Sequence, residues 1–81
     1  MPKNHSNRQF CKIVALLLRE ARERQGLSRS AVAKRAGLSY QMIARMERNQ
    51  YIHKMVNFFR IAHALELKPV KILAQAEKLS G

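Results

Sequence analysis

The feature of this sequence that most limits its possible folds is a very short link between two helical segments. Only Gly37, Leu38 and Ser39 separate a predicted helix at Arg29–Ala36 from the next one. Each segment follows a serine, Ser28 or Ser39, whose hydroxyl oxygen can accept a hydrogen bond from the free N–H groups of a helix start. So short a link forces a sharp turn between the two helices. Glycine at position 37 can adopt the positive φ that such a turn needs.

Apolar residues at spacings of three and four predict further helices on both sides of this pair. The expected ranges are Phe10–Gln25, Lys54–Leu65 and Pro69–Leu79, and the helix after Ser39 is expected to run to Glu47 or Arg48. The apolar residues expected in the core are Phe10, Val14, Leu17, Leu18, Ala21, Val32, Ala33, Ala36, Ile43, Met46, Met55, Phe58, Phe59, Ala62 and Leu65. No segment alternates with period two. The sequence therefore predicts an all-α protein, a compact five-helix bundle.

The chain has 81 residues, which is enough for one domain. Its first nine residues are polar and lack a helical repeat, so we predict a flexible basic arm over residues 1–9 and the folded domain over residues 10–81.

Charge separates the possible functions more sharply than length does. Sixteen Lys and Arg oppose five Asp and Glu, for a net charge of +11. No acidic residue occurs between Arg24 and Met46, whereas a purely solubilising surface would mix both signs. The segment is therefore predicted to contact a polyanion, most simply nucleic acid. For Lys34 and Arg35 alone, a solvated face is the better interpretation. The arm residues Lys3 and Arg8 are equally compatible with contact to DNA and with no function.

Other classes of function find little support in the sequence. The single Cys11 allows neither an internal disulfide nor a cysteine zinc site, and the three histidines do not have metal-ligand spacing. The carboxylates form no readable catalytic pair. We therefore expect no enzyme activity, no metal and no cofactor. No signal peptide and no membrane-spanning run is visible, which predicts a cytoplasmic protein associated with the nucleoid. A membrane-surface helix at Phe10–Gln25 explains the apolar pattern less well than a bundle does.

The segment Gly26–Ser39 and the residues after it resemble the XRE family, the helix-turn-helix type of the lambda and 434 repressors and Cro. With Arg29 as the first motif position, Ala33, Gly37 and Ile43 fall at the fifth, ninth and fifteenth, as in that family. Met46, Glu47 and Arg48 continue the match, and Phe59–Leu65 resembles the family's fourth helix. The resemblance covers roughly Val14–Leu73. It implies a lambda-repressor-like domain whose third helix enters the major groove of DNA.

Several site residues follow from the resemblance, each at the position that matches the family motif. The residues expected to face bases are Ser39, Tyr40, Gln41, Ala44 and Arg45. Of these, Gln41 suits adenine and Arg45 suits guanine, because each pair can form two hydrogen bonds. Ser28 and Arg29 match phosphate-binding positions of the family. Around the loop after the third helix, Arg48, Gln50 and Lys54 are expected to add further phosphate contacts. Arg22 and Glu47 match a buried ion pair of the 434-type proteins, and we expect them to orient the third helix.

Apolar residues beyond those needed for the core suggest a partner surface. Val70, Leu73, Ala76 and Leu79 in the last helix, together with Leu16, are predicted to form the interface of a homodimer. A dimer would place two third helices about 34 Å apart on pseudo-palindromic DNA.

The sequence also departs from the family pattern in places. Asn49 replaces a common glycine, and no cap is recognisable before the helix at Lys54–Leu65. Tyr40 stands where the 434 type has glutamine, so the operator sequence of the 434 type cannot be assigned to this chain. The predicted function is a dimeric transcriptional regulator that binds double-stranded DNA at an operator. The alternative is an antitoxin that binds a protein toxin and regulates its own operon.

Overall fold

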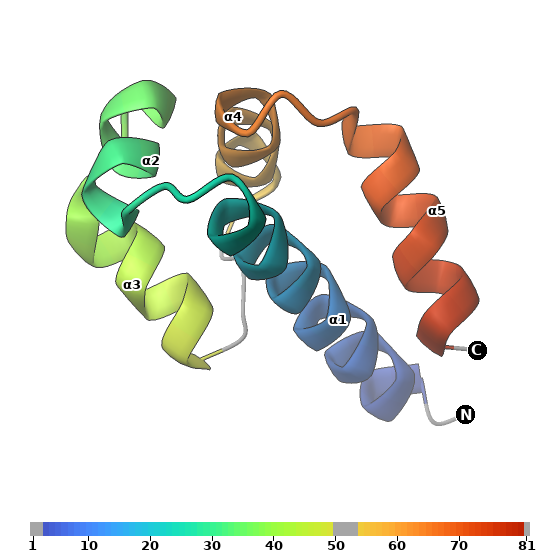
Figure 1. The fold of residues 1–81 in the computed structure, drawn as a ribbon. Helices are drawn as coiled ribbons and strands as arrows, with labels where there is room; N and C mark the ends of the chain where they lie inside the picture. Colours follow the sequence, from blue (N-terminus) through green and yellow to red (C-terminus); the bar gives the residue numbers. More distant parts are fainter. Residues whose placement is uncertain (1–2, 50–53, 81) are drawn as a thin grey trace.

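The computed structural model describes the backbone of residues 3–49 and 54–80, and the side chains of residues 8–48 and 54–80. Within these ranges the chain forms five helices and no strand, as predicted. They are α1 Lys3–Arg24, α2 Arg29–Ala36, α3 Tyr40–Asn49, α4 Met55–Ala64 and α5 Pro69–Ser80 (Figure 1). α1 begins earlier than the predicted start at Phe10. The prediction of a flexible arm over residues 1–9 stays a prediction.

α1 is the helix around which the others are arranged (Figure 1). It packs along α5 on one side and against α3 on the other, while α2 packs on both α3 and α4. In the view of Figure 1, α2 and α3 lie to the left of α1, and α5 lies to its right. The bundle therefore has one side built by α2 and α3 and another built by α5.

The core lies where these helices meet. Its largest fully buried side chains are Leu18, Ile43, Leu65 and Val32, one from each of three helices and one from the end of α4. Two of the predicted core residues in α4 lie outside it, because Met55 is 61% exposed and Phe59 is 40% exposed. The face of α4 that packs inward carries Phe58, Ile61 and Ala62 instead. The prediction of burial was therefore wrong for Met55 and Phe59.

Three helices end in the same way, with a left-handed residue followed by leucine. The left-handed residues are Gly26, Gly37 and Glu66, with φ of 69°, 71° and 59°. The next residue donates its N–H to a carbonyl five residues back: Leu27 to Arg22 at 3.1 Å, Leu38 to Ala33 at 2.9 Å and Leu67 to Ala62 at 2.9 Å. All three leucines pack against the core. A left-handed turn followed by a partly buried leucine fixes where each helix ends.

α5 turns two of its residues directly into the core, and this corrects one interface prediction. Ile72 is 7% exposed and Ala76 is 0% exposed, because residues four apart share a helix face and this face packs on α1. Ala76 therefore has no surface to offer a second chain.

Candidate nucleic-acid interface

Two serine caps and one glycine set the geometry of α2 and α3. Ser28 Oγ accepts a hydrogen bond from the N–H of Ala31 at 3.0 Å, and Ser39 Oγ accepts one from the N–H of Met42 at 3.1 Å. Both caps are confirmed. A Cβ at Gly37 would lie 3.4 Å from Nη1 of Arg60, an ordinary contact, so the requirement for glycine is its left-handed backbone.

α3 has one buried face and one exposed face. Ser39, Tyr40, Gln41 and Arg45 are exposed, as expected of residues that face a ligand. Ala44 was placed with them, but it is only 5% exposed. Because both α1 and α2 pack on α3, the buried part of the α3 surface is wider than the stripe formed by Ile43 and Met46. Ala44 is therefore removed from the candidate contact surface.

The predicted phosphate-contacting residues fall into three groups. Ser28, Arg48 and Lys54 are exposed. Gln50 lies outside the described residues. Arg29 is partly buried, because its side chain contacts Glu47. Lys54 also begins α4 without a side-chain cap, in agreement with the missing sequence signal.

The ion pair predicted between Arg22 and Glu47 forms with two hydrogen bonds. Arg22 Nε donates to Glu47 Oε2 at 2.6 Å, and Nη2 donates to Oε1 at 3.0 Å. Arg22 Nη1 donates to the carbonyl of Leu27 at 2.8 Å. The last turn of α1, the loop after it and the last turn of α3 are thereby joined.

Sequence reasoning missed a second arginine on the same carboxylate. Arg29 Nε donates to Glu47 Oε1 at 2.9 Å, so Glu47 is held by α1 and by α2. We call Arg22, Arg29 and Glu47 the Glu47 cluster. The Glu47 side chain is 1% exposed, against 13% for Arg22 and 34% for Arg29. A sequence signal existed, because the first turn of α2, which begins at Arg29, has no acidic residue that could pair with this arginine.

The contacts in this cluster shift the pKa values of Glu47 and Arg29. Burial alone would raise the pKa of Glu47, but hydrogen bonds from Arg22 and Arg29 outweigh it, so the pKa lies below its ordinary value. The pKa of Arg29 is raised, first by its hydrogen bond to Glu47 and then by the phenol of Tyr40. Glu47 is therefore ionised at neutral pH, and Arg29 stays charged.

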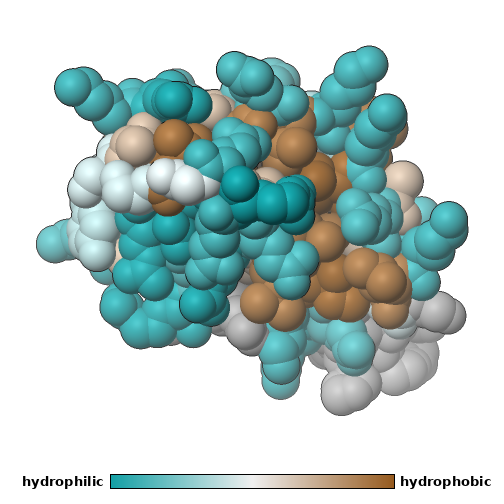
Figure 2. Space-filling model, viewed as in Figure 1, coloured by the Kyte–Doolittle hydropathy of each residue, from teal (hydrophilic) through white to brown (hydrophobic). Residues whose placement is uncertain are grey.

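The surface divides into two parts on the face drawn in Figure 2. Hydrophilic residues cover much of α3 and the near end of α1, the region of α2 is mixed, and hydrophobic residues gather between α1 and α5 (Figures 1 and 2). Of the predicted interface residues, Val70 is 74% exposed and Leu79 is 59% exposed. Leu16 and Leu73 are half-buried. The predicted base-facing and apolar surfaces thus lie on different parts of the molecule.

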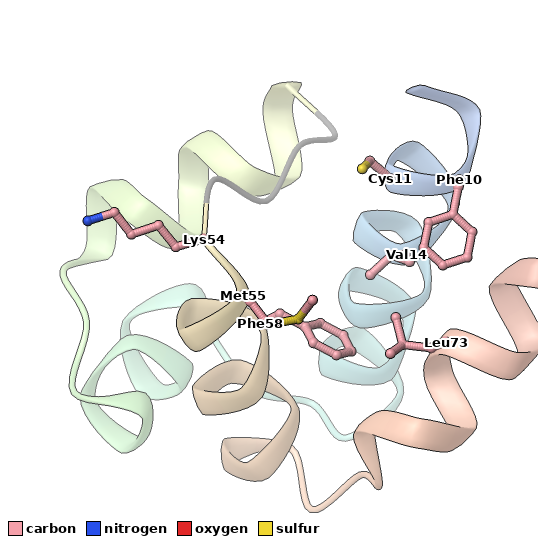
Figure 3. Close-up of a pocket in the computed structure, with 7 residues that line it drawn as sticks. All are labelled: Phe10, Cys11, Val14, Lys54, Met55, Phe58 and Leu73. Carbon is pink, nitrogen blue, oxygen red and sulfur yellow. The ribbon is translucent and has the colours of Figure 1, made fainter. Parts of the chain in front are cut away.

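A small apolar pocket of about 110 Å³ opens between α1, α4 and α5 (Figure 3). Its lining residues are Phe10, Cys11, Val14, Lys54, Met55, Phe58 and Leu73. The Lys54 side chain points away from the apolar side chains (Figure 3).

Among the described residues, no helix is long and apolar enough to cross a bilayer.

Comparison with known families matches residues 18–72 to the model of one family, described as Helix-turn-helix. The match begins in α1 and ends in α5, so it contains the Glu47 cluster and all of α2, α3 and α4. No curated protein and no solved structure matches the chain.

Proposed function

The chain belongs to the XRE family of DNA-binding helix-turn-helix proteins, and we propose that it is a sequence-specific transcriptional regulator that reads double-stranded DNA with α3. In this proposal α3 lies in the major groove, with Tyr40, Gln41 and Arg45 toward the base edges. Ser39 lies at the start of the same helix. Ser28, Arg48 and Lys54 contact phosphates, which set the orientation of the protein on DNA.

The observation that carries the proposal is the arrangement of α3. The buried carboxylate of Glu47 joins α3 to Arg22 of α1. Tyr40, Gln41 and Arg45 of the same helix are exposed. A helix that reads base edges must be held at one orientation, because a hydrogen bond to a base weakens steeply with misalignment. An ion pair with two hydrogen bonds supplies such directional support.

The second part of the proposal is a homodimer formed through the apolar side of the molecule. Val70, Leu73 and Leu79 in α5 and Leu16 in α1 supply its contacts, and Ala76 supports them from the core. A twofold dimer presents two copies of α3 to two half-sites of one operator.

The test of base reading is selection of DNA from a random pool by the pure protein, followed by affinity measurements on the selected site. Arg45→Ala is expected to cost about 1–3 kcal/mol of binding free energy and to relax the preference at one base pair. Lys34→Ala is the matched control, with at most a small loss that is equal on all sequences. Equal losses from both variants on every DNA would refute base reading by α3.

The dimer is tested separately, by sedimentation of the protein with and without the selected DNA. We expect two half-sites related by a pseudo-palindrome and a complex with two protein chains on one DNA. A single chain on a single, asymmetric half-site would contradict the dimer and leave base reading intact.

A further inference from the structure

The Glu47 cluster contains one cation more than a buried carboxylate requires. Arg22 alone already meets both oxygens of Glu47, at 2.6 and 3.0 Å. Such a bidentate pair neutralises the charge of a carboxylate and gives each of its oxygens one hydrogen bond. Arg29 nevertheless adds a third hydrogen bond at 2.9 Å. With two guanidinium groups and one carboxylate, the cluster keeps a net positive charge.

The position of this extra cation is unfavourable for the helix that carries it. Arg29 is the first residue of α2, whose first turn has no acidic side chain. The start of a helix is the positive end of its dipole and disfavours a cation. Residues that oppose local stability are expected where function uses them.

We propose that Glu47 is a positioning residue for DNA binding, because it holds the guanidinium of Arg29 ready to meet a phosphate of the DNA backbone. The inference rests on the proposed function and adds Arg29 to the residues that contact a phosphate. Arg29 contacts Glu47 through Nε, the guanidinium nitrogen nearest the backbone. The phenol of Tyr40 lies close to the same guanidinium. The two terminal nitrogens can still meet a second anion, because about a third of the side chain is exposed, at 34%.

The gain in DNA-binding free energy comes from the side chain of Arg29, which is ordered before DNA binds. A free arginine loses side-chain freedom when it binds a phosphate, and that loss weakens binding. Arg29 has already lost much of this freedom to Glu47. A carboxylate beside a phosphate would by itself repel DNA, so a gain in affinity from Glu47 is the opposite of what its charge alone predicts.

The first experiment replaces the guanidinium of Arg29 by an ammonium group and keeps the positive charge. Arg29→Lys leaves the pair between Arg22 and Glu47 in place, and a lysine ammonium cannot hold Glu47 through one nitrogen while offering two others. We expect about a tenfold loss of affinity for the selected DNA. Arg35→Lys, exposed on the last turn of the same helix, is the matched control and should bind as wild type. Wild-type affinity for Arg29→Lys would overturn the proposal.

The second experiment is a double-mutant cycle of Arg29→Gln and Glu47→Gln, measured as DNA affinity. If Glu47 positions Arg29, then Arg29→Gln costs about tenfold less in the Glu47→Gln background than in wild type. Additive effects would mean that Glu47 acts only through Arg22, and would overturn the proposal. Unfolding curves establish that each variant is folded. If Glu47→Gln does not fold, Arg29→Lys decides alone.

Salt dependence distinguishes this inference from the proposed function. Arg29→Gln is expected to lower the salt slope of binding by about one phosphate contact, whereas Arg29→Lys keeps it. If wild-type protein binds selected and scrambled DNA equally, sequence-specific reading fails. The cycle on that DNA still tests whether Glu47 positions Arg29, because phosphate contacts do not depend on sequence.

Discussion

The two sides of α1 are held together by different forces. Toward α2 and α3, Arg22 of α1 joins a buried carboxylate of α3 with hydrogen bonds of 2.6 and 3.0 Å. Toward α5, Ile72 and Ala76 bury apolar surface. Hydrogen-bonded ions fix direction, whereas apolar contact is nondirectional and depends mainly on area. The helix proposed to read DNA thus has directional contacts in addition to its buried Ile43 and Met46, whereas Ile72 and Ala76 hold α5 by apolar contact.

Removing the carboxylate is expected to give the largest effect on this comparison. Glu47→Ala leaves Arg22, only 13% exposed, without its partner, and should lower the free energy of unfolding by about 3–5 kcal/mol. Urea denaturation measures the loss. Glu77→Ala on the exposed face of α5 is the control and should change stability by less than about 0.5 kcal/mol. A small loss for Glu47→Ala would show that α3 does not depend on the cluster.

A truncation on the apolar side should cost somewhat less. Ile72→Ala truncates a residue that is only 7% exposed, and should cost about 2–4 kcal/mol. The same denaturation assay applies, with Val70→Ala, at 74% exposure, as a nearly neutral control. If Val70→Ala cost as much as Ile72→Ala in the monomer, the assigned inward face of α5 would be wrong.

Acid should affect the two sides differently. The pKa of Glu47 is lower in the folded chain than its ordinary value of 4.5, because hydrogen bonds from Arg22 and Arg29 outweigh burial. Its contribution to stability is therefore complete above pH 4.5 and is lost as the pH falls through the folded pKa. Stability measured from pH 7 to pH 3 should fall less steeply in Glu47→Gln than in wild type, and Ile72→Ala should keep the wild-type slope. Identical slopes in Glu47→Gln and wild type would contradict this.

The smallest expected effect concerns the end of α4, where the chain turns toward α5. Glu66 has φ of 59°, whereas the matching turns after α1 and α2 use glycine. Glu66→Gly should stabilise the protein by about 0.5–1 kcal/mol, as relief of backbone strain outweighs the added freedom of the unfolded chain. Gly26→Ala is the reciprocal control and should destabilise by a similar amount, although no atom lies within 4 Å of the added Cβ. Thermal unfolding of both variants measures this.

The elements near α2 and α3 could be predicted from local chemistry. Ser28, Ser39 and Gly37 act through hydrogen bonds and backbone angles within a few residues, and α2 has the predicted bounds. The end of α4 was predicted at Leu65, one residue beyond its observed end at Ala64, although Glu66 occupies a turn where glycine is the usual signal.

The candidate site was predicted in part. Exposure of Tyr40, Gln41 and Arg45 follows from their place off the Ile43 and Met46 stripe. The burial of Ala44 does not follow from that stripe, because it depends on α1 and α2 packing on α3 together.

The sequence by itself determined the number of helices, the sharp turn at Gly37 and the basic character of the surface around it. These depend on spacing, caps and charge, which act locally or sum along the chain. Only the tertiary structure decided that Arg29 shares Glu47 with Arg22, and that Ala76 faces inward while Met55 faces solvent. Such outcomes depend on which helices meet and at what rotation, and a single helix carries no record of the neighbour that will cover it.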